Sequence, residues 1–167
     1  MKIIVSDTGP VLHLKEAGLL KLLQKAGKVC IPKMVDNELN EIDPLWRKEK
    51  PEWIFIEPLQ PDEIKETEFL FISGLISLGE AEAIVLAKRL NPKWFLTDDT
   101  EARIFATSLE MEVHGSLGIV LWSAAVGNLN YPEAEEAIEK LSKTSLWVSK
   151  DILSQAHEAL KIIFEKK

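Results

Sequence analysis

The sequence predicts an α/β fold in three layers, with a mainly parallel central sheet flanked by helices. Short β-branched or aromatic runs, such as residues 2–6 and 94–97, alternate with longer segments whose apolar residues recur at helical spacing. Several of these runs end at aspartate or proline and lead directly into a helical segment, which is the order of a βα unit. With 167 residues, 46% of them apolar, the chain has the size of one domain with a real core. We expect a single domain over residues 1–167, with a helical extension from about residue 130.

The expected elements follow in chain order. The first part is expected to contain strands at residues 2–6 and 29–31, helical segments at 11–14, 19–23 and 33–42, and an irregular connection at 43–61 with a possible edge strand at 53–56. The second part is expected to contain helices at residues 62–71, 80–90, 100–109, 116–126, 132–141 and 152–165, and strands at 94–97 and 111–114. Asp62 is a plausible N-cap for its helix, and Asn91 with Pro92 ends the helix before them.

Composition limits the class of protein. The single cysteine, Cys30, excludes an internal disulfide, and residues 1–20 lack the long apolar core of a signal peptide. No apolar run approaches the roughly 18 residues of a membrane span, so we expect a cytoplasmic protein. The formal net charge of −7 argues against a broad electropositive surface for nucleic acid. Cations bound by a cluster of carboxylates would offset part of that charge.

Acidic residues follow two of the predicted strands. Asp7 comes directly after the first strand, and Asp98 and Asp99 follow the run at 94–97. The carboxyl ends of parallel strands are where open α/β sheets place their ligand crevices. Each aspartate also has a purely structural interpretation, as a turn residue or as the N-cap of the following helix. One cap needs only one aspartate, however, and two stand at residues 98 and 99.

Two further acidic positions lie on helices. On the helix at 33–42, Glu38 projects into a stripe of apolar side chains, while Asp36 is expected to point the other way. A carboxylate that faces a core is costly unless a partner, a proton or a metal compensates it. At the start of the helix at 80–90, Glu80 lies inside the apolar arc and Glu82 at its margin, so helix geometry favours Glu80. The structural interpretation of both is stabilisation by the helix dipole.

These acidic positions are easier to explain by convergence on one crevice than by independent caps. A carboxylate cluster needs a counter-charge at neutral pH, and its hard oxygen atoms suit Mg²⁺ or Mn²⁺. The chemistry indicated is phosphodiester hydrolysis, in which one or two metal ions activate water and stabilise the leaving oxygen.

The ordered motifs resemble those of PIN-domain proteins, in particular the small prokaryotic group related to toxin-antitoxin (VapC-like) ribonucleases. The resemblance covers residues 3 to about 126. Its elements are Ile4-Val5-Ser6-Asp7-Thr8, Ile31-Pro32 with Val35 to Leu39, Leu78-Gly79-Glu80-Ala81-Glu82-Ala83-Ile84, Leu96-Thr97-Asp98-Asp99 and Gly115-Ser116-Leu117-Gly118.

The resemblance implies a PIN-like fold and Mg²⁺- or Mn²⁺-dependent cleavage of RNA. The implied metal ligands are Asp7, Glu38, Glu80, Glu82, Asp98 and Asp99, and the implied catalytic residues among them are Asp7, Glu38, Glu82 and Asp99. Family spacing favours Glu82 where helix geometry favours Glu80, and it favours Asp99 with Asp98 as second choice. The resemblance also suggests a homodimer and a toxin restrained by a separate antitoxin protein.

The resemblance leaves the contacts with the substrate open. The candidates are Thr8, Thr97 and Arg103. Gly9 stands where the family often has a hydroxyl residue, so Thr8 is the remaining source of a hydroxyl near the metal. Arg103 is able to meet a phosphate, but an ion pair with Glu101 or Asp99 is the preferred interpretation.

Three other functions match parts of the sequence less well. Asp7-Thr8-Gly9 also matches the short signature of aspartic proteases, but those enzymes bring two copies together in an all-β framework. A non-catalytic PIN-like module that binds a partner protein or RNA is the main alternative, favoured by the negative charge. A receiver or phosphatase-like domain is poorly supported, because no phosphate-binding loop is present. His13 is expected to be a packed or surface histidine, and Trp147, like the other tryptophans, to serve the core or a dimer interface.

Overall fold

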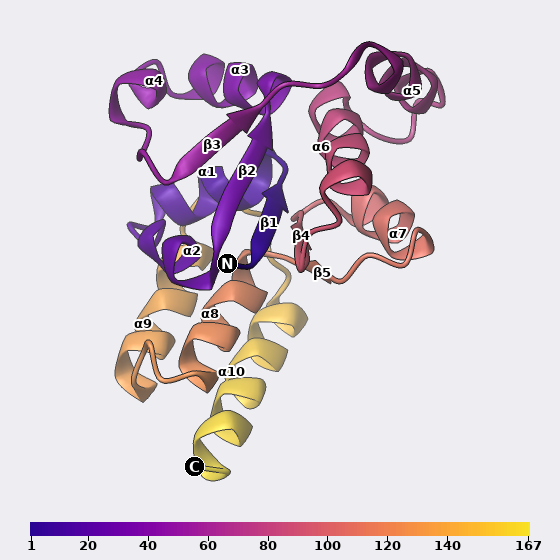
Figure 1. Cartoon of the computed structure of the whole chain (residues 1–167). Helices are drawn as coiled ribbons and strands as arrows, with labels where there is room; N and C mark the ends of the chain where they lie inside the picture. Colours follow the sequence, from indigo (N-terminus) through magenta and orange to yellow (C-terminus); the bar gives the residue numbers. More distant parts are fainter.

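A sheet of five parallel strands forms the centre of the computed structural model, which describes residues 1–167 (Figure 1). The strands are β1 (Ile3–Ser6), β2 (Lys28–Pro32), β3 (Ile54–Glu57), β4 (Trp94–Leu96) and β5 (Val113–His114). Their order in the sheet is β3-β2-β1-β4-β5, with Ser6 of β1 beside Leu96 of β4. The predicted α/β fold with a parallel sheet is confirmed. Because the last residues of β1 and β4 are neighbours, the chain leaves both strands at the same edge of the sheet.

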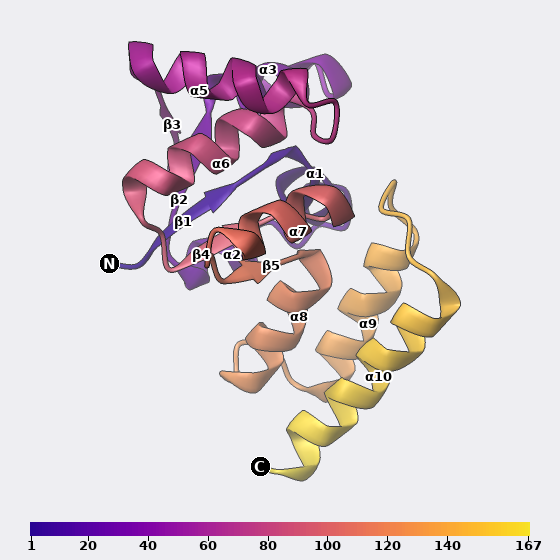
Figure 2. The same cartoon turned by 90° about the vertical axis from the view of Figure 1, so that its right-hand side faces the viewer.

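Ten helices connect and cover the strands (Figures 1 and 2). They are α1 (Thr8–Glu16), α2 (Lys21–Ala26), α3 (Lys33–Ile42), α4 (Trp46–Glu49), α5 (Pro61–Ile72), α6 (Leu78–Leu90), α7 (Thr100–Ser108), α8 (Ser116–Ala125), α9 (Tyr131–Ser142) and α10 (Lys150–Glu165). None of these helices is long and apolar enough to cross a membrane.

The sheet separates two apolar cores. Alternate residues of a strand point to opposite faces, so Ile4 of β1 packs among α1, α2 and α8, whereas its neighbour Val5 packs against α6 and α7. The same alternation places Trp94 and Leu96 of β4 in the first core and Phe95 in the second. Both faces are therefore covered, which explains why the strands are almost continuously apolar.

Helices α8, α9 and α10 pack side by side beyond one end of the sheet (Figure 2). The loop that joins α9 to α10, residues 143–149, extends from this bundle back toward α1. Two hydrogen bonds hold it there, because the backbone N–H and the hydroxyl of Ser145 both donate to Glu16 of α1. This loop brings residues from near the end of the chain to the carboxyl edge of the sheet.

Three local predictions are wrong. The connection at 43–61 contains the short helix α4, because Trp46 is fully buried and anchors it. Helix α5 starts at Pro61 with Gln60 as N-cap, so Asp62 does not cap it. Asp36 does not point to solvent but is buried, where it accepts hydrogen bonds from the Trp46 indole at 2.8 Å and from Nε of Arg47 at 3.2 Å. The predicted edge strand at 53–56 is confirmed as β3.

Candidate active site

A cleft of about 330 Å³ opens at the carboxyl edge of the sheet, where the chain leaves β1 and β4. Its lining consists of Asp7, Thr8, Gly9, His13, Glu38, Ser77, Glu80, Asp98, Asp99, Thr100, Leu146 and Trp147. Five of these twelve residues carry a carboxyl group, and none is a lysine or an arginine. Residues from five separate parts of the chain thus form one acidic surface.

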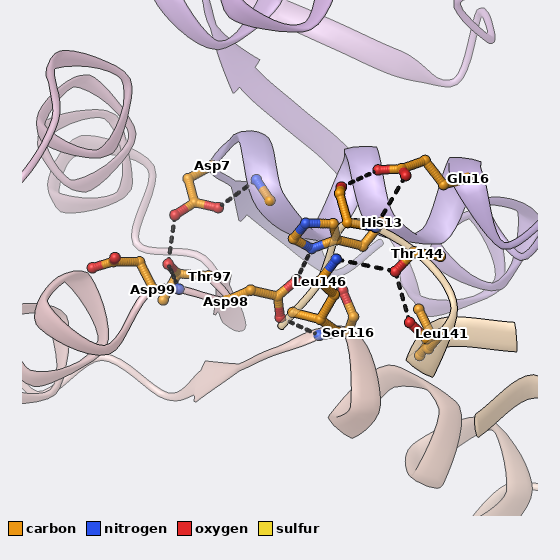
Figure 3. A network of polar contacts seen from close by, with 12 residues as sticks. Asp7, His13, Glu16, Thr97, Asp98, Asp99, Ser116, Leu141, Thr144 and Leu146 are labelled. Carbon is orange, nitrogen blue, oxygen red and sulfur yellow. Dashed lines mark hydrogen bonds and ion pairs between the residues drawn. The ribbon is translucent and has the colours of Figure 1, made fainter. Parts of the chain in front are cut away.

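Asp7 takes part in the polar contacts of this cleft through both of its carboxylate oxygen atoms (Figure 3). It is the N-cap of α1, where its Oδ1 accepts the N–H of Gly9 at 3.2 Å, and only 3% of the residue is exposed. Its Oδ2 accepts the hydroxyl of Thr97 at 2.5 Å. Burial, followed by the charges of Asp98 and Glu80, raises the pKa of Asp7 well above its ordinary value despite these hydrogen bonds. The site therefore holds a buried carboxyl group that no lysine or arginine side chain neutralises.

Asp98 is held by groups from two helices (Figure 3). Its Oδ1 accepts the backbone N–H of Ser116 at 2.7 Å, and its Oδ2 accepts the Ser116 hydroxyl at 2.6 Å. Nδ1 of His13 lies 2.7 Å from the same Oδ2. A Cβ atom at Gly115 would approach Oδ1 of Asp98 to 2.7 Å, which explains why this position, the N-cap of α8, has no side chain. Asp98 is thus fixed by its neighbours, with few lone pairs left for a ligand.

Asp99 is more accessible than Asp98. It is the N-cap of α7, where Oδ1 accepts the N–H of Ala102 at 2.8 Å, and its side chain is exposed on the cleft wall. Its own backbone N–H donates to the hydroxyl of Thr97 at 3.1 Å. Thr97 is fully buried beneath the cleft and links Asp7 to the start of α7.

Glu38 reaches the cleft from α3. Its carboxylate accepts a hydrogen bond from the hydroxyl of Thr8. It also packs closely on the first turn of α6, because a Cβ atom at Gly79 would lie 2.5 Å from Oε1 of Glu38. No lysine or arginine pairs with it, so the salt-bridged core carboxylate that a structural role would require is absent. Gly79 is the feature that lets α3 and α6 approach at this point.

Glu80 and Glu82 occupy different environments. Glu80 lines the cleft and forms a capping box with Ser77, whose N–H it accepts at 2.8 Å. Burial, and then the charges of Asp99 and Glu38, raise its pKa although Ser77 acts in the opposite direction. Glu82 lies outside the cleft lining and accepts the N–H of Met34 at 3.0 Å, in the first turn of α3. Burial is the main cause that raises the pKa of Glu82.

The remaining substrate-contact candidates are also placed by the structure. Thr8 is on the cleft wall, and Thr97 is beneath it. Arg103 is exposed outside the acidic cleft and forms no ion pair with Glu101 or Asp99, so that preferred interpretation is wrong. Its guanidinium donates instead to the backbone carbonyl of Thr97 at 3.3 Å.

The chemistry of the donor set fits a hard divalent cation. Asp7, Glu38, Glu80 and Asp99 present carboxylate oxygen atoms to one cleft, and two of the four have raised pKa values because of burial and neighbouring acids. No three acidic, histidine or cysteine side chains are close enough together to form a ready-made metal site. The donors are therefore gathered in one cleft but not arranged around one point.

Sequence reasoning missed several residues of the cleft. His13 was interpreted as a packed or surface residue, yet it contacts Asp98 across 85 positions of the chain. The signal was its position one turn after Gly9 on α1, which places it on the cleft side of the helix. Ser77, Leu146 and Trp147 gave no comparable signal, since only the tertiary fold brings them to the cleft.

Fold and site together define a parallel α/β protein with an acidic cleft at the carboxyl ends of its strands. Comparison with known families agrees with this class. A family model described as PIN domain matches residues 3–161, and the chain belongs to this family. PIN domains are generally nucleases that act on nucleic acids and typically use divalent metal ions, which gives the chain a nuclease-type function. Searches of curated proteins and of solved structures found no match.

Proposed function

We propose that the protein is a Mg²⁺- or Mn²⁺-dependent endoribonuclease that hydrolyses RNA phosphodiester bonds in the acidic cleft. One observation carries the proposal: four carboxylates from separate elements, Asp7, Glu38, Glu80 and Asp99, line a single cleft that contains no lysine or arginine. Such a concentration of negative charge is unfavourable unless a cation is bound. The family membership supports the reaction class, and the resemblance to toxin-antitoxin ribonucleases supports RNA as the substrate.

Asp7, Glu38, Glu80 and Asp99 are the proposed metal ligands within this cleft. A bound divalent cation would activate a water molecule and stabilise the leaving oxygen. Asp98 is proposed as a positioning residue, because its oxygen atoms are already engaged by Ser116 and His13. Glu82 is proposed to act on the start of α3 through Met34.

The other residues of the site orient these carboxylates. Thr97 donates to Asp7 and fixes the direction of its Oδ2, while Thr8 does the same for Glu38. These two hydroxyl groups keep the carboxylates in one orientation before a cation arrives, which lowers the cost of arranging them.

The test is an RNA cleavage assay with Mn²⁺ or Mg²⁺ that compares the wild type with Asp7→Asn and Glu38→Gln. We expect cleavage by the wild type, loss in a chelator, and a loss of at least about a hundredfold in both variants. Glu41→Gln is the matched control, because Glu41 is an exposed acid on the same helix as Glu38. Cleavage without metal, or full activity in both variants, would overturn the mechanism.

A role as a toxin within the cytoplasm, restrained by an antitoxin, and a homodimeric state are further parts of this proposal. They are supported by the resemblance and by large apolar side chains exposed on α5 and α7, such as Phe69, Ile72 and Ile104. Light scattering after size-exclusion chromatography gives the molar mass and so tests whether the protein is a homodimer. The toxin role is tested by expressing the protein in cells: growth should stop, and co-expression of an antitoxin encoded by a neighbouring gene should restore it.

A non-catalytic PIN-like module that binds a partner protein or RNA is the second candidate. It is favoured by the absence of any three metal-binding side chains gathered around one point and by the double hydrogen bonding of Asp7. The two functions differ in the cleavage assay. A wild type that binds RNA or a protein tightly but cleaves no RNA with either metal would support the module.

A further inference from the structure

Trp147, in the loop between α9 and α10, is exposed although it is a large apolar residue. The residue is 82% exposed, whereas Trp46 and Trp94 are buried and Trp53 and Trp122 are packed against the core. Of the two roles expected for Trp147, the core is therefore wrong, and a dimer interface stays a prediction. Removing an indole from water is favourable, so an exposed indole beside a cleft indicates a contact with something outside the chain.

The loop that carries Trp147 is held in place by hydrogen bonds (Figure 3). Ser145 donates its hydroxyl to Glu16 at 2.5 Å and its backbone N–H to the same carboxylate at 3.2 Å. Thr144 donates to the carbonyl of Leu141 at 2.7 Å and accepts the N–H of Leu146 at 3.2 Å. These contacts keep Leu146 and Trp147 on the wall of the acidic cleft.

A second pocket of about 340 Å³ adjoins that cleft. The two cavities share Asp98, Thr100, Leu146 and Trp147. The second pocket adds Arg103, His114 and mainly apolar residues from β5, α8, α10 and the loop, so its character differs from that of the acidic cleft.

Arg103 is the chain's only arginine without a carboxylate partner. Arg47 pairs with Asp36 and Arg89 pairs with Glu63, whereas the one hydrogen bond of Arg103 runs to the carbonyl of Thr97. Since a guanidinium has five N–H donors, most of its donors remain available. The pocket thus places a free cation and an exposed aromatic ring beside the carboxylate cluster.

We infer that this second pocket is a nucleotide subsite for single-stranded RNA, in which the Trp147 indole stacks on one base and the Arg103 guanidinium binds a neighbouring phosphate. The inference rests on the proposed ribonuclease function, which puts the scissile phosphate in the acidic cleft. It adds the position of the flanking nucleotide and the single-stranded character of the substrate.

The net charge of the chain and the side chains of the second pocket both favour single-stranded RNA as its ligand. A chain of net charge −7 has no broad basic surface to retain a phosphate backbone, and the acidic cleft repels one. Retention then depends on local anchors, and Arg103 and Trp147 supply a cation and an exposed ring in the second pocket. Stacking requires a base whose face is free, so the substrate is single-stranded at this position. Because every base has such a face, the subsite tolerates different sequences.

Fluorescence anisotropy of a short labelled oligouridylate tests the subsite in two buffers, one with EDTA and one with Ca²⁺. Trp147→Ala should weaken binding about tenfold, and Trp147→Phe should retain most of the affinity. Arg103→Gln should weaken binding and reduce the slope of log affinity against log salt by about 0.7. The controls are Phe55→Ala, which removes a 42% exposed aromatic residue on β3, and Lys65→Gln, which removes an exposed charge on α5. Both controls should bind like the wild type.

Cleavage kinetics provide the second readout. In Mn²⁺, Trp147→Ala should raise KM about tenfold with kcat nearly unchanged, since the indole binds a flanking base and not the scissile bond. Circular dichroism should show that each variant is folded, because both side chains are exposed. Trp147→Ala and the wild type should have the same affinity for duplex RNA. The affinity for single-stranded DNA of matched sequence measures the contribution of the ribose.

Several outcomes overturn the subsite. One is the absence of RNA binding by the wild type in both buffers, and another is unchanged affinity in both Trp147→Ala and Arg103→Gln. If Trp147→Ala abolishes self-association in sedimentation but leaves RNA affinity intact, the indole serves a protein interface instead. Binding without any cleavage refutes the ribonuclease proposal alone, while cleavage with an unaltered KM in both variants refutes the subsite alone.

Discussion

Asp7 illustrates at the scale of one residue how a candidate active site costs stability. Its carboxyl group is 3% exposed, has no basic partner and lies near Asp98 and Glu80. Burial, with the neighbouring acids, raises its pKa, so ionisation at neutral pH opposes folding. The first prediction follows from this conflict. In chelator, Asp7→Asn should raise the free energy of unfolding at pH 7 by about 1–2 kcal/mol while it removes nuclease activity.

The sign of the pH dependence follows from the raised pKa. Below the pKa of an unfolded aspartate the carboxyl group is protonated in both states, so the wild type carries no penalty there. The penalty develops as pH rises from the unfolded-state pKa to the folded-state pKa, because in this range only the unfolded state releases the proton. Urea unfolding across this range should therefore show the variant and the wild type converging at low pH. A variant that is less stable than the wild type at pH 7 would contradict this account.

Gly79 is the residue that lets α3 and α6 meet at Glu38. A Cβ atom at Gly79 would lie 2.5 Å from Oε1 of Glu38, so Gly79→Ala should displace the carboxylate and reduce cleavage at least about tenfold. In a Glu38→Ala background the same substitution should stabilise the protein by about 0.5–1 kcal/mol, because the clash is gone and alanine favours the helix. Thermal unfolding of the single and double variants measures this coupling.

Gly118→Ala is the matched control for Gly79→Ala. Gly118 also lies in a helix, α8, but a Cβ atom there would meet only His114, at an ordinary distance of 3.6 Å. Because Gly118 lines the second pocket, the comparison with Gly79→Ala is made in kcat and not in KM. This control should gain stability and keep its activity. Equal behaviour of the two glycine variants would show that the approach of Glu38 to α6 has no role in the site.

At the scale of elements, α4 depends on one buried carboxylate of α3. Asp36 is 1% exposed and accepts hydrogen bonds from Trp46, Arg47 and Lys33. Burial acts to raise the pKa of Asp36, but these hydrogen bonds outweigh it and hold the pKa below the ordinary value. Asp36→Ala should lower the free energy of unfolding by about 3 kcal/mol at pH 7, because it leaves the buried indole N–H without a partner.

A depressed pKa stabilises the protein above the pKa of the unfolded aspartate, and this contribution is lost as pH falls through the folded-state value. Urea unfolding should therefore show the difference between Asp36→Ala and the wild type shrinking below about pH 4. Glu41→Ala, an exposed acid on the same helix, should change little at either pH. A constant difference down to pH 2 would refute the role of the Asp36 charge.

The helices and strands also show how much of the fold could be predicted from the sequence. The strands and most helices follow from local periodicity and turn residues, and α3 occupies the predicted range. Helix α4 could not be predicted, because it is fixed by Trp46, whose burial is a tertiary property. The same limit applies to Asp36, which a helical wheel places on the outer face without knowledge of α4.

At the scale of the molecule, the candidate site was predictable where it depends on the ends of elements. Parallel strands share one edge, so Asp7 and Asp99 at their ends, with Glu38 on a following helix, were expected to meet and line one cleft. The contacts that orient them, such as His13 with Asp98, join residues far apart in sequence and carry no local pattern. The loop with Trp147 returns to the cleft only because α9 and α10 pack beyond the sheet.

If the acidic cleft binds a divalent cation, as we propose, the stability of the whole molecule will depend on metal. Ligands that bind only the folded state stabilise it by mass action, by about 2.7 kcal/mol at a concentration of 100 times Kd. For a chain of this length, that corresponds to a rise in Tm of about 5–10 °C. Differential scanning fluorimetry with Mn²⁺ or Mg²⁺ should show this rise for the wild type and its reversal by EDTA.

Asp7→Asn should combine a higher Tm in EDTA with a much smaller response to metal, since the same carboxylate causes the penalty and binds the cation. Asp62→Asn is the control, because Asp62 is an exposed acid on α5 outside the cleft. It should respond to metal like the wild type. If Mn²⁺ raises the Tm of Asp7→Asn as much as that of the wild type, the cation binds elsewhere on the acidic surface. The carboxylates of the cleft would then remain an uncompensated charge cluster, as expected of the non-catalytic module.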